Sequence, residues 1–386
     1  MNIVHICLTG GYTERFTYQE NYLTKYHSRM GNKVTLITTQ YCWHKDNWGK
    51  CLDTNYQNQD GTEIIRIPYK YNISYKINTY IGRFVGLYDL LENIKPHLIF
   101  IHNLQFNDID QIVKYKKKHN NIKIVVDNHS DFSNSARNWI TLNVLYKLYW
   151  RRNARKIKDY AEHFYGVLPA RVEFLEKIYK LPGNKCELLV MGSDDEEVER
   201  VGQPENQKKV RRNLGIVDTD FVIVTGGKID AWKKQTLTLM RAVKELKEET
   251  IKLIVFGNVA NEIKEEFDKL CDENRVKYVG WANASKSYDF FSVADLVVFP
   301  GRHSVYWEEV AGLGIPMVCK YWPGTTHVDL GGNVIFLKED SVEEIKKAIL
   351  DIFNSPDKYK EMKRIAEEKG MEVFSYRKIS QKAITG

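Results

Sequence analysis

Residues 299–319 read Phe299-Pro-Gly-Arg-His-Ser-Val-Tyr-Trp-Glu-Glu-Val-Ala-Gly-Leu-Gly-Ile-Pro-Met-Val-Cys319. The apolar runs at its two ends, Leu296–Phe299 and Ile315–Cys319, predict buried strands. Between them we expect a polar loop and a short helix with Glu308 and Glu309 in its first turn. Open α/β sheets bind ligands at the carboxyl ends of their strands, where carboxylates are suited to accept hydrogen bonds from sugar hydroxyls. The alternative is that the two acids only complement the helix dipole.

The same alternation of strands and helices extends over the whole chain, in two series. Strands of the first series are predicted at Asn2–Leu8, Lys33–Thr38, Glu63–Ile67, His97–His102, Lys123–Asn128, Phe164–Val167 and Lys185–Val190. Strands of the second are predicted at Phe221–Thr225, Lys252–Phe256, Val276–Val279, Leu296–Phe299, Pro316–Lys320 and Val334–Leu337. Helices are expected between them, including one at Tyr80–Glu92 and a long helical zone at about Thr141–Tyr160. Such alternation is typical of parallel sheets covered on both faces.

A polar, charged segment separates the two series, from Met191 to about Arg212. The sequence therefore predicts an α/β fold with two Rossmann-like domains, residues 1–191 and 192–370, whose parallel sheets face a deep interdomain cleft. Residues 371–386 are expected to pack back on the N-terminal domain. A chain of 386 residues is long enough for two such cores.

Composition indicates a cytoplasmic protein. Met1–Leu8 is strand-like rather than a signal peptide, and no apolar run approaches the roughly 20 residues that span a bilayer. The six cysteines are scattered without a metal-type or redox-type pairing, so reduced thiols are expected.

Positive charge is concentrated in the first half. Residues 1–190 hold 27 Lys and Arg against 17 Asp and Glu, a net charge of +10, whereas the remainder carries −3. Basic and aromatic residues mix at Lys147–Lys158, which suits either an anionic membrane face or an ordinary solvated helix face. Nucleic acid is not an expected partner, because the second half is acidic and no binding motif is present.

Paired glycines follow the first strand of each series, at Gly10-Gly11 and at Gly226-Gly227. Neither pair belongs to a Gly-x-Gly-x-x-Gly or Walker A motif. Glycines after a strand still let a phosphate approach the backbone amides, and Lys228, Lys233 and Lys234 add positive charge beside the second pair. We expect a diphosphate site there; ordinary surface lysines are the alternative.

Polar side chains also follow other predicted strands. His102 ends one strand, and His129 and Asp131 lie just past another. A single histidine is more often structural, but two at the carboxyl ends of strands point to a site. The loop Trp322–Gly332 offers the hydroxyls of Thr325 and Thr326 to phosphate or sugar oxygens.

Taken together, these motifs resemble the retaining GT-B glycosyltransferases of family 4 (group 1), over nearly the whole chain. The family's interdomain turn is similar to Val190-Met-Gly-Ser-Asp194, and its Gly-Arg…Lys phosphate clamp to Gly227–Lys234, with Lys228 where arginine is usual. Val255-Phe-Gly257 and the segment Val276–Trp281 resemble the strands beside the nucleotide base. The loop chemistry is closest to that of bacterial capsule and exopolysaccharide glycosyltransferases.

One family motif is incomplete. The family carries Glu-x7-Glu, and counting back from Gly314-Ile-Pro316 places its second glutamate at Glu309. The first glutamate would fall on Gly301, so this chain lacks it; His303 and Ser304 stand in the same loop and offer other contacts.

The resemblance implies transfer of a sugar, without a metal or cofactor, from a UDP- or GDP-sugar to a hydroxyl of a glycan or polyprenyl-linked acceptor. A peripheral position on the inner face of the cell membrane would suit such an acceptor. The catalytic residues implied are His129, Glu309, Glu308, Lys228 and Lys234. The ligand-binding residues implied are Gly10, Gly11, Gly227, Lys233, Gly257, Trp281, His303, Ser304, Thr325 and Thr326. The alternatives are another GT-B enzyme, such as a nucleotide-sugar epimerase or a phosphorylase-like protein, and a non-catalytic sugar-nucleotide binding protein.

Overall fold

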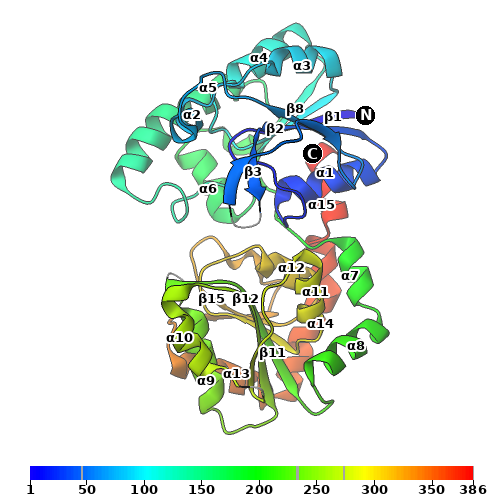
Figure 1. Cartoon of the computed structure of the whole chain (residues 1–386), viewed down its shortest axis with the longest axis vertical. Helices are drawn as coiled ribbons and strands as arrows, with labels where there is room; N and C mark the ends of the chain where they lie inside the picture. Colours follow the sequence, from blue (N-terminus) through cyan, green and yellow to red (C-terminus); the bar gives the residue numbers. More distant parts are fainter. Residues whose placement is uncertain (45–46, 232–233, 273, 386) are drawn as a thin grey trace. The chain divides into compact units, whose positions relative to one another are not determined.

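The structure is a computed structural model that describes residues 1–44, 47–231, 234–272 and 274–385. It divides into two compact units (Figure 1). Unit 1 consists of Met1–Val190 together with Ile379–Gly386, and unit 2 of Met191–Lys378. Each unit is a predominantly parallel sheet with helices packed on it, so the predicted α/β class is confirmed.

The main sheet of unit 1 has the strand order β10-β9-β8-β7-β1-β2-β6-β5, in which only β5 is antiparallel to its neighbour. The strands are β1 (Asn2–Cys7), β2 (Lys33–Thr39), β5 (Asn55–Gln57), β6 (Glu63–Ile67), β7 (Leu98–His102), β8 (Lys123–Asn128), β9 (His163–Gly166) and β10 (Cys186–Leu188). The strand order reverses between β1 and β7, which lie side by side in the middle of the sheet. From β1 the chain first adds strands on one side, and from β7 onward it adds them on the other.

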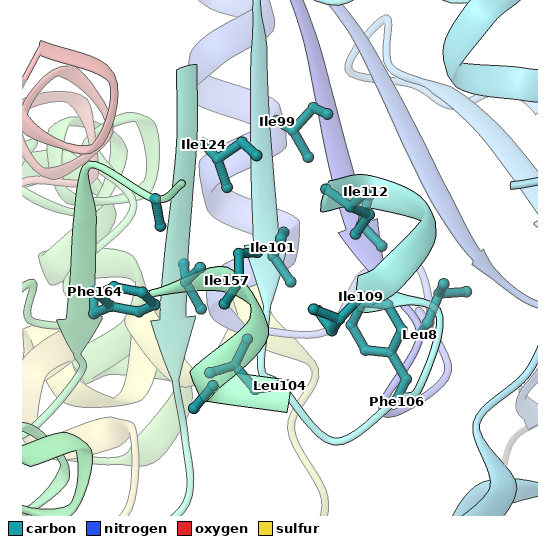
Figure 2. Close-up of a cluster of buried hydrophobic side chains, with 14 of the residues drawn as sticks. Leu8, Ile99, Ile101, Leu104, Phe106, Ile109, Ile112, Ile124, Ile157 and Phe164 are labelled. Atoms are coloured by element: carbon teal, nitrogen blue, oxygen red, sulfur yellow. The ribbon is translucent and has the colours of Figure 1, made fainter. Parts of the chain in front are cut away.

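Apolar side chains bind the helices of unit 1 to this sheet. Ile99 and Ile101 of β7 share a buried cluster with Ile109 and Ile112 (Figure 2). Burying such side chains contributes about 25 cal/mol for each Å² removed from water. The helices are α1 (Gln19–Arg29), α2 (Tyr75–Ile81), α3 (Leu87–Ile94), α4 (Ile109–Lys118), the π-helix η1 (Thr141–Trp150), α5 (Arg151–Ile157), α6 (Pro169–Lys177), the short η2 (Gly183–Lys185) and, from the end of the chain, α15 (Tyr376–Thr385).

Two predicted helices of unit 1 differ from the structure. The helix expected at Tyr80–Glu92 is two helices, α2 and α3, because Gly82 and Gly86 adopt φ values of 54° and 84° that a right-handed helix cannot contain. The helical zone expected at Thr141–Tyr160 ends earlier and begins as a π-helix.

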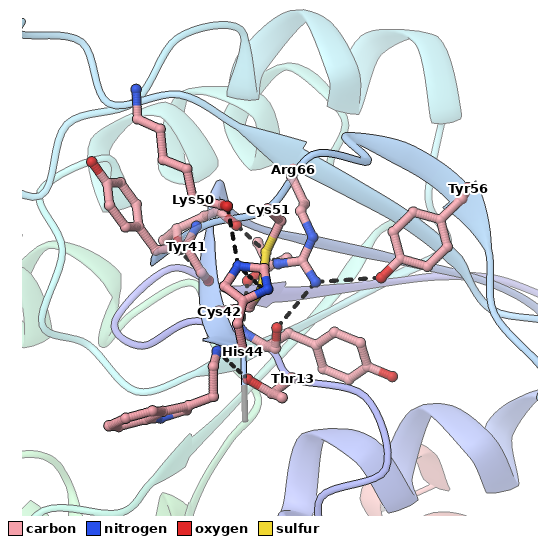
Figure 3. The surroundings of a disulfide bond; sticks show 12 residues. Thr13, Tyr41, Cys42, His44, Lys50, Cys51, Tyr56 and Arg66 are labelled. Carbon is pink, nitrogen blue, oxygen red and sulfur yellow. Dashed lines mark hydrogen bonds between the residues drawn. A yellow bond between two sulfur atoms is a disulfide. The ribbon is translucent and has the colours of Figure 1, made fainter. Parts of the chain in front are cut away.

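A small antiparallel hairpin, β3 (Tyr41–His44) with β4 (Asn47–Lys50), was not predicted. It carries a disulfide between Cys42 and Cys51 (Figure 3), so the expectation that all cysteines are reduced is wrong. The physical reason is the pairing itself, which sets Cys42 opposite Gly49 and brings the two cysteine Cα atoms to 6.1 Å. The other four cysteines are free thiols.

The sheet of unit 2 has the order β13-β12-β11-β14-β15-β16 and is parallel throughout. Numbered within the unit, this order is 3-2-1-4-5-6, which is the Rossmann order with its reversal between β11 and β14. The strands are β11 (Phe221–Ile229), β12 (Ile251–Val259), β13 (Val276–Tyr278), β14 (Leu296–Phe299), β15 (Met317–Lys320) and β16 (Val334–Leu337).

Helices lie on both sides of this sheet (Figure 1). On one side α9 (Gln235–Glu245) contacts both α10 (Asn261–Leu270) and α13 (Val342–Phe353). The other helices are α7 (Asp195–Val201), α8 (Pro204–Leu214), α11 (Ala284–Ser292), α12 (Tyr306–Gly312), the short η4 (Thr326–Val328) and α14 (Pro356–Val373).

The charged segment after Met191 is helical rather than a linker. The Asp194 carboxylate accepts a hydrogen bond from the amide of Glu196 and so caps α7. Pro204 begins α8, and Gly215 ends it in a left-handed conformation. None of the helices that the structure describes has the length and apolar character needed to cross a membrane.

Candidate functional site

The quoted stretch 299–319 lies at the point where the strand order of unit 2 reverses. Phe299 ends β14, and β11 is the neighbouring strand. The loop after Phe299 leads into α12, whose first turn carries Glu308 and Glu309 as predicted. Open parallel sheets commonly bind ligands at this reversal point, and the two carboxylates lie there.

Glu308 is fully buried between two histidines. Its Oε1 atom lies 2.8 Å from Nε2 of His303 and 2.8 Å from Nε2 of His327. Burial alone would raise the pKa of the carboxyl, but the two imidazoles lower it to about 2. Oε2 of Glu308 has no hydrogen-bond partner among the described residues. We refer to His303, Glu308 and His327 as the Glu308 cluster. Its buried carboxylate is ionised, and only one of the two carboxylate oxygens is hydrogen-bonded to the histidines.

Glu309 is buried on the adjoining part of α12. Its backbone carbonyl accepts a hydrogen bond of 2.7 Å from the Ser193 hydroxyl. Burial and the charge of the Glu309 carboxylate raise the pKa of Tyr306 and of Tyr288, which places the carboxylate near both phenols. The two glutamates therefore occupy different surroundings, imidazole for Glu308 and phenol for Glu309.

The glycines expected in a phosphate loop instead lie inside strands. Gly226 and Gly227 belong to β11, which continues to Ile229. Gly227 pairs with Gly257 of β12, and a Cβ atom on Gly257 would lie 1.8 Å from the Gly227 carbonyl oxygen. The expected loop position is therefore wrong, because the glycines permit close pairing of the two strands.

Of the predicted phosphate-binding lysines, two lie in the described part of the chain. Lys228 is 69% exposed, and its ammonium lies 3.2 Å from the Asp230 carboxylate. Lys234 is exposed at the position preceding α9. Lys233 lies outside the described residues.

Of the other predicted ligand contacts of unit 2, some lie near the Glu308 cluster and others do not. Ser304 accepts a backbone bond from Trp307 at the start of α12, close to His303. Thr325 is buried, and its hydroxyl donates to the Trp322 carbonyl at 2.9 Å rather than facing a ligand. Thr326 is exposed at the start of η4. Trp281 is 67% exposed, and no described contact joins it to the Glu308 cluster.

In unit 1, the predicted glycine pair lies directly after β1, at the second reversal point. Gly10 is exposed, with open space where a Cβ atom would stand. A Cβ atom on Gly11 would lie 2.0 Å from the carbonyl oxygen of Tyr41 and 2.5 Å from the Trp48 ring. Gly11 therefore allows the hairpin to pack on the loop, a role that the sequence did not indicate.

The predicted histidines of unit 1 meet at one carboxylate. Nδ1 of His102 lies 2.8 Å from Oδ2 of Asp127, and Nε2 of His129 lies 3.2 Å from the same oxygen. Burial would lower the pKa of His102, but the charge of Asp127 raises it above its ordinary value. The same histidines hold the pKa of Asp127 below its usual range against the effect of burial. Asp131 does not belong to this group; its carboxylate forms an ion pair with Arg171.

Sequence reasoning missed one residue of each group, the central Asp127 in unit 1 and the flanking His327 in unit 2. Asp127 and His327 lie within stretches that the sequence singled out, two residues before His129 and directly after Thr326. Their roles depend on neighbouring strands and loops, which a single strand pattern does not reveal. His102, Asp127 and His129, like the Glu308 cluster, bring polar atoms within 4.8 Å of one another. Hydrogen bonds already join His102 to Asp127 and both histidines to Glu308, and we assign a metal to neither group.

Comparison with known proteins connects this geometry to a family. Residues 220–355 match the model of a family described as "Glycosyl transferases group 1". No curated protein sequence matches the chain.

Solved structures match it over nearly its whole length. Anabaena Alr3699/HepE in complex with UDP has 15% identity and a TM-score of 0.69, covering 99% of this chain and 98% of its own. WaaG, a glycosyltransferase involved in lipopolysaccharide biosynthesis, has 14% identity and a TM-score of 0.65, with all of both chains covered. UDP-GlcNAc 2-epimerase from Neisseria meningitidis bound to UDP-GlcNAc has 14% identity and a TM-score of 0.63, covering 100% and 98%. The chain thus has a GT-B-like fold of two Rossmann-like units, and its residues 220–355 carry the match to the group 1 glycosyl transferases.

Proposed function

We propose that the protein is a retaining glycosyltransferase of the group 1 type. It transfers a sugar from a UDP- or GDP-sugar to a hydroxyl of a glycan or polyprenyl-linked acceptor in the synthesis of a bacterial surface polysaccharide. The observation that carries the proposal is the family match of residues 220–355, because this segment contains the buried glutamates at the strand-order reversal of unit 2. UDP in the similar Anabaena structure supports a nucleotide-sugar donor.

Unit 2 would hold the donor. Glu308 or Glu309 would accept hydrogen bonds from donor hydroxyls, since both stand in the first turn of α12, directly after β14 at the strand-order reversal. Lys228 and Lys234 would neutralise the diphosphate as it leaves. The bond from the anomeric carbon to the diphosphate oxygen breaks, and a bond from that carbon to the acceptor oxygen forms on the same face. The acceptor proton passes to the departing diphosphate, and the two lysines would supply the positive charge that a metal supplies elsewhere.

Unit 1 would bind the acceptor and present His129. The His129 ring is one-quarter exposed and rests against Asp127, so it is held in place while remaining accessible. Its role would be to accept a hydrogen bond from a substrate hydroxyl and so orient it, since positioning of this kind contributes to catalysis without a covalent intermediate.

Ligand-induced stabilisation tests the proposal. A ligand that binds only the folded state at 100 times its Kd stabilises it by about 2.7 kcal/mol. We expect one UDP- or GDP-sugar to raise the Tm, and acceptor to be required for rapid release of the nucleoside diphosphate from that donor. The second candidate is a nucleotide-sugar epimerase, which the structural similarity of the Neisseria enzyme supports. Release of the nucleoside diphosphate without acceptor, together with a change of configuration in the recovered sugar, would favour it. No Tm change with any nucleotide would count against both.

The acceptor site would lie at a membrane surface. Trp139, Ile140 and Leu148 are each more than 60% exposed, and the nearby Arg152 and Arg155 are exposed on α5. Exposed apolar and basic side chains in one segment favour an anionic bilayer over plain solvent. Sedimentation with anionic vesicles should capture the protein. At high salt, replacing Trp139 and Leu148 with serine should reduce this capture more than replacing Arg152 and Arg155 with glutamine does. Equal capture of all variants would contradict a membrane role for this segment.

A further inference from the structure

A chain of hydrogen bonds between buried histidines runs through unit 1 behind Asp127. Nε2 of His102 lies 3.0 Å from Nδ1 of His5, and Nε2 of His5 lies 2.9 Å from Nδ1 of His27. Nε2 of His27 lies 2.9 Å from the carbonyl oxygen of Ser380 in α15. All three imidazoles are buried, on β7, β1 and α1. This arrangement connects Asp127 to a helix from the end of the chain.

The two ends of the chain fix the number of protons in it. The Ser380 carbonyl and the Asp127 carboxylate can each only accept a hydrogen bond from the ring beside it. Four hydrogen bonds therefore connect two acceptors through three rings, and each bond requires one proton. Three neutral imidazoles carry only three protons. One of the three rings must be an imidazolium while Asp127 is ionised.

The neighbouring charges locate the additional proton. Asp127 from β8 lies against His102, and Glu20 from α1 adds negative charge there. Burial and the adjacent histidines lower the pKa of His5, and burial lowers that of His27 to about 4, so these two rings are neutral. His102 is then the imidazolium, and His5 and His27 each carry their proton on Nε2.

The ionised state of Asp127 is supported from its other side. Oδ1 accepts a hydrogen bond of 3.2 Å from the amide of Asn103, and Oδ2 faces Nε2 of His129 at 3.2 Å. The His129 nitrogen is buried and is not aligned with a hydrogen-bond acceptor among the described residues. A carboxylate this close favours the tautomer with the proton on Nε2, which makes Nδ1 the accepting nitrogen of His129.

We propose that Asp127 and His102 are positioning residues for His129, with the one additional proton of the buried histidine chain keeping Asp127 ionised. This inference rests on the proposed function only for the statement that His129 contacts a substrate hydroxyl. Asp127 fixes the tautomer of His129, and the chain through His5 and His27 fixes the charge of Asp127. The alternative is that the chain merely fastens α15 to unit 1.

Nitrogen NMR distinguishes these two roles without any substrate. In protein labelled with ¹⁵N-histidine and kept in EDTA at neutral pH, we expect protonation of both nitrogens of His102, of Nε2 alone in His5 and His27, and a proton on Nε2 of His129. Asp127→Asn should abolish the His102 imidazolium and the tautomer preference of His129, and Asp127→Glu should restore both. His119→Gln, which alters a surface pair with Glu92, is the matched control and should leave these four signals in place.

The outcomes separate this inference from the proposed function. Neutral His102 in the folded wild type, or unchanged His129 signals in Asp127→Asn, would overturn it whether or not the protein binds a nucleotide sugar. With the donor and acceptor identified by the Tm screen, Asp127→Asn should lower kcat by on the order of 10²-fold with little change in the donor KM. Unchanged kcat beside changed His129 signals would overturn the positioning role. An intact Tm for each variant would establish that the protein is folded, and Asp127→Glu serves as the second variant if Asp127→Asn does not fold.

Discussion

Oε1 of Glu308 lies 2.8 Å from Nε2 of His303, in a position where both groups are shielded from water. A buried carboxylate normally favours its neutral form, yet here the imidazoles lower its pKa to about 2 from an ordinary value of 4.5. The ionised form is thus a property of the folded state.

The first prediction concerns acid stability. Because the folded-state pKa of Glu308 is lowered, its stabilising contribution is present above pH 4.5 and is lost as the pH falls toward 2. A shift of this size corresponds to on the order of 3 kcal/mol. We expect Glu308→Gln to lower the free energy of unfolding at pH 7 and to flatten its dependence between pH 5 and pH 2, measured by urea unfolding. Glu343→Gln, on the exposed side of α13, is the control; parallel pH curves for Glu308→Gln and wild type would contradict the prediction.

The second prediction concerns the paired glycines of β11 and β12. Gly257 has φ of 129°, and a Cβ atom there would lie 1.8 Å from the Gly227 carbonyl oxygen. Gly257→Ala should therefore destabilise the protein by about 2 to 4 kcal/mol through backbone strain and overpacking. Gly10→Ala meets nothing within 4 Å and should stay within about 0.5 kcal/mol of wild type. Equal Tm values for the two variants would mean that β11 and β12 are not paired at this point.

The third prediction concerns nucleotide binding. If Lys228 and Lys234 neutralise a diphosphate, Lys228→Ala and Lys234→Ala should each weaken UDP or GDP binding by about 10-fold, the value of one charge-assisted contact. Isothermal calorimetry provides the measurement. Lys269→Ala, which removes an exposed lysine paired with Glu265 on α10, should bind the nucleotide like wild type. Wild-type affinity in both test variants would place the diphosphate elsewhere.

The fourth prediction concerns the hairpin disulfide. Closing the short loop between Cys42 and Cys51 should stabilise unit 1 by about 2 to 3 kcal/mol. Mass spectrometry after alkylation should find these two cysteines protected, the half-buried Cys271 reactive in the folded protein, and the buried Cys7, Cys186 and Cys319 reactive only on unfolding. Cys42→Ser should lower the Tm, whereas Cys271→Ser should change it little. Alkylation of Cys42 and Cys51 in the native protein would rule out the bond.

The sequence was sufficient for the strands of both main sheets except β5, a three-residue antiparallel edge strand that was not predicted. Glu63–Ile67 and Lys123–Asn128 were predicted with the bounds that the structure has, because buried parallel strands are continuous apolar runs between polar segments. The hairpin strands β3 and β4 were missed because they are only four residues each and mix aromatic with polar residues, and because the loop at Gly11 on which they pack is distant in sequence.

The site could be predicted only in part, for a similar reason. Glu308 and Glu309 follow a strand directly and were identified from that position. His5 and His27 are single polar residues inside an apolar strand and a helix. Their hydrogen bonds become apparent only once the fold sets β1 beside β7 and packs α1 against β1. The glycines after the first strand of unit 2 were assigned to a loop because the pattern does not distinguish a strand end from a glycine-bearing strand that continues.

The return of residues 379–386 to unit 1 has a consequence for synthesis on the ribosome. Unit 2 is continuous in sequence and can fold once residue 378 has emerged, as domains generally do during translation. Unit 1 is made first, but the Ser380 carbonyl that accepts from His27 is translated after the whole of unit 2. Unit 1 therefore cannot complete its interior while unit 2 is being synthesised. The hydrogen bond of His27 to the Ser380 carbonyl forms only after α15 has been made.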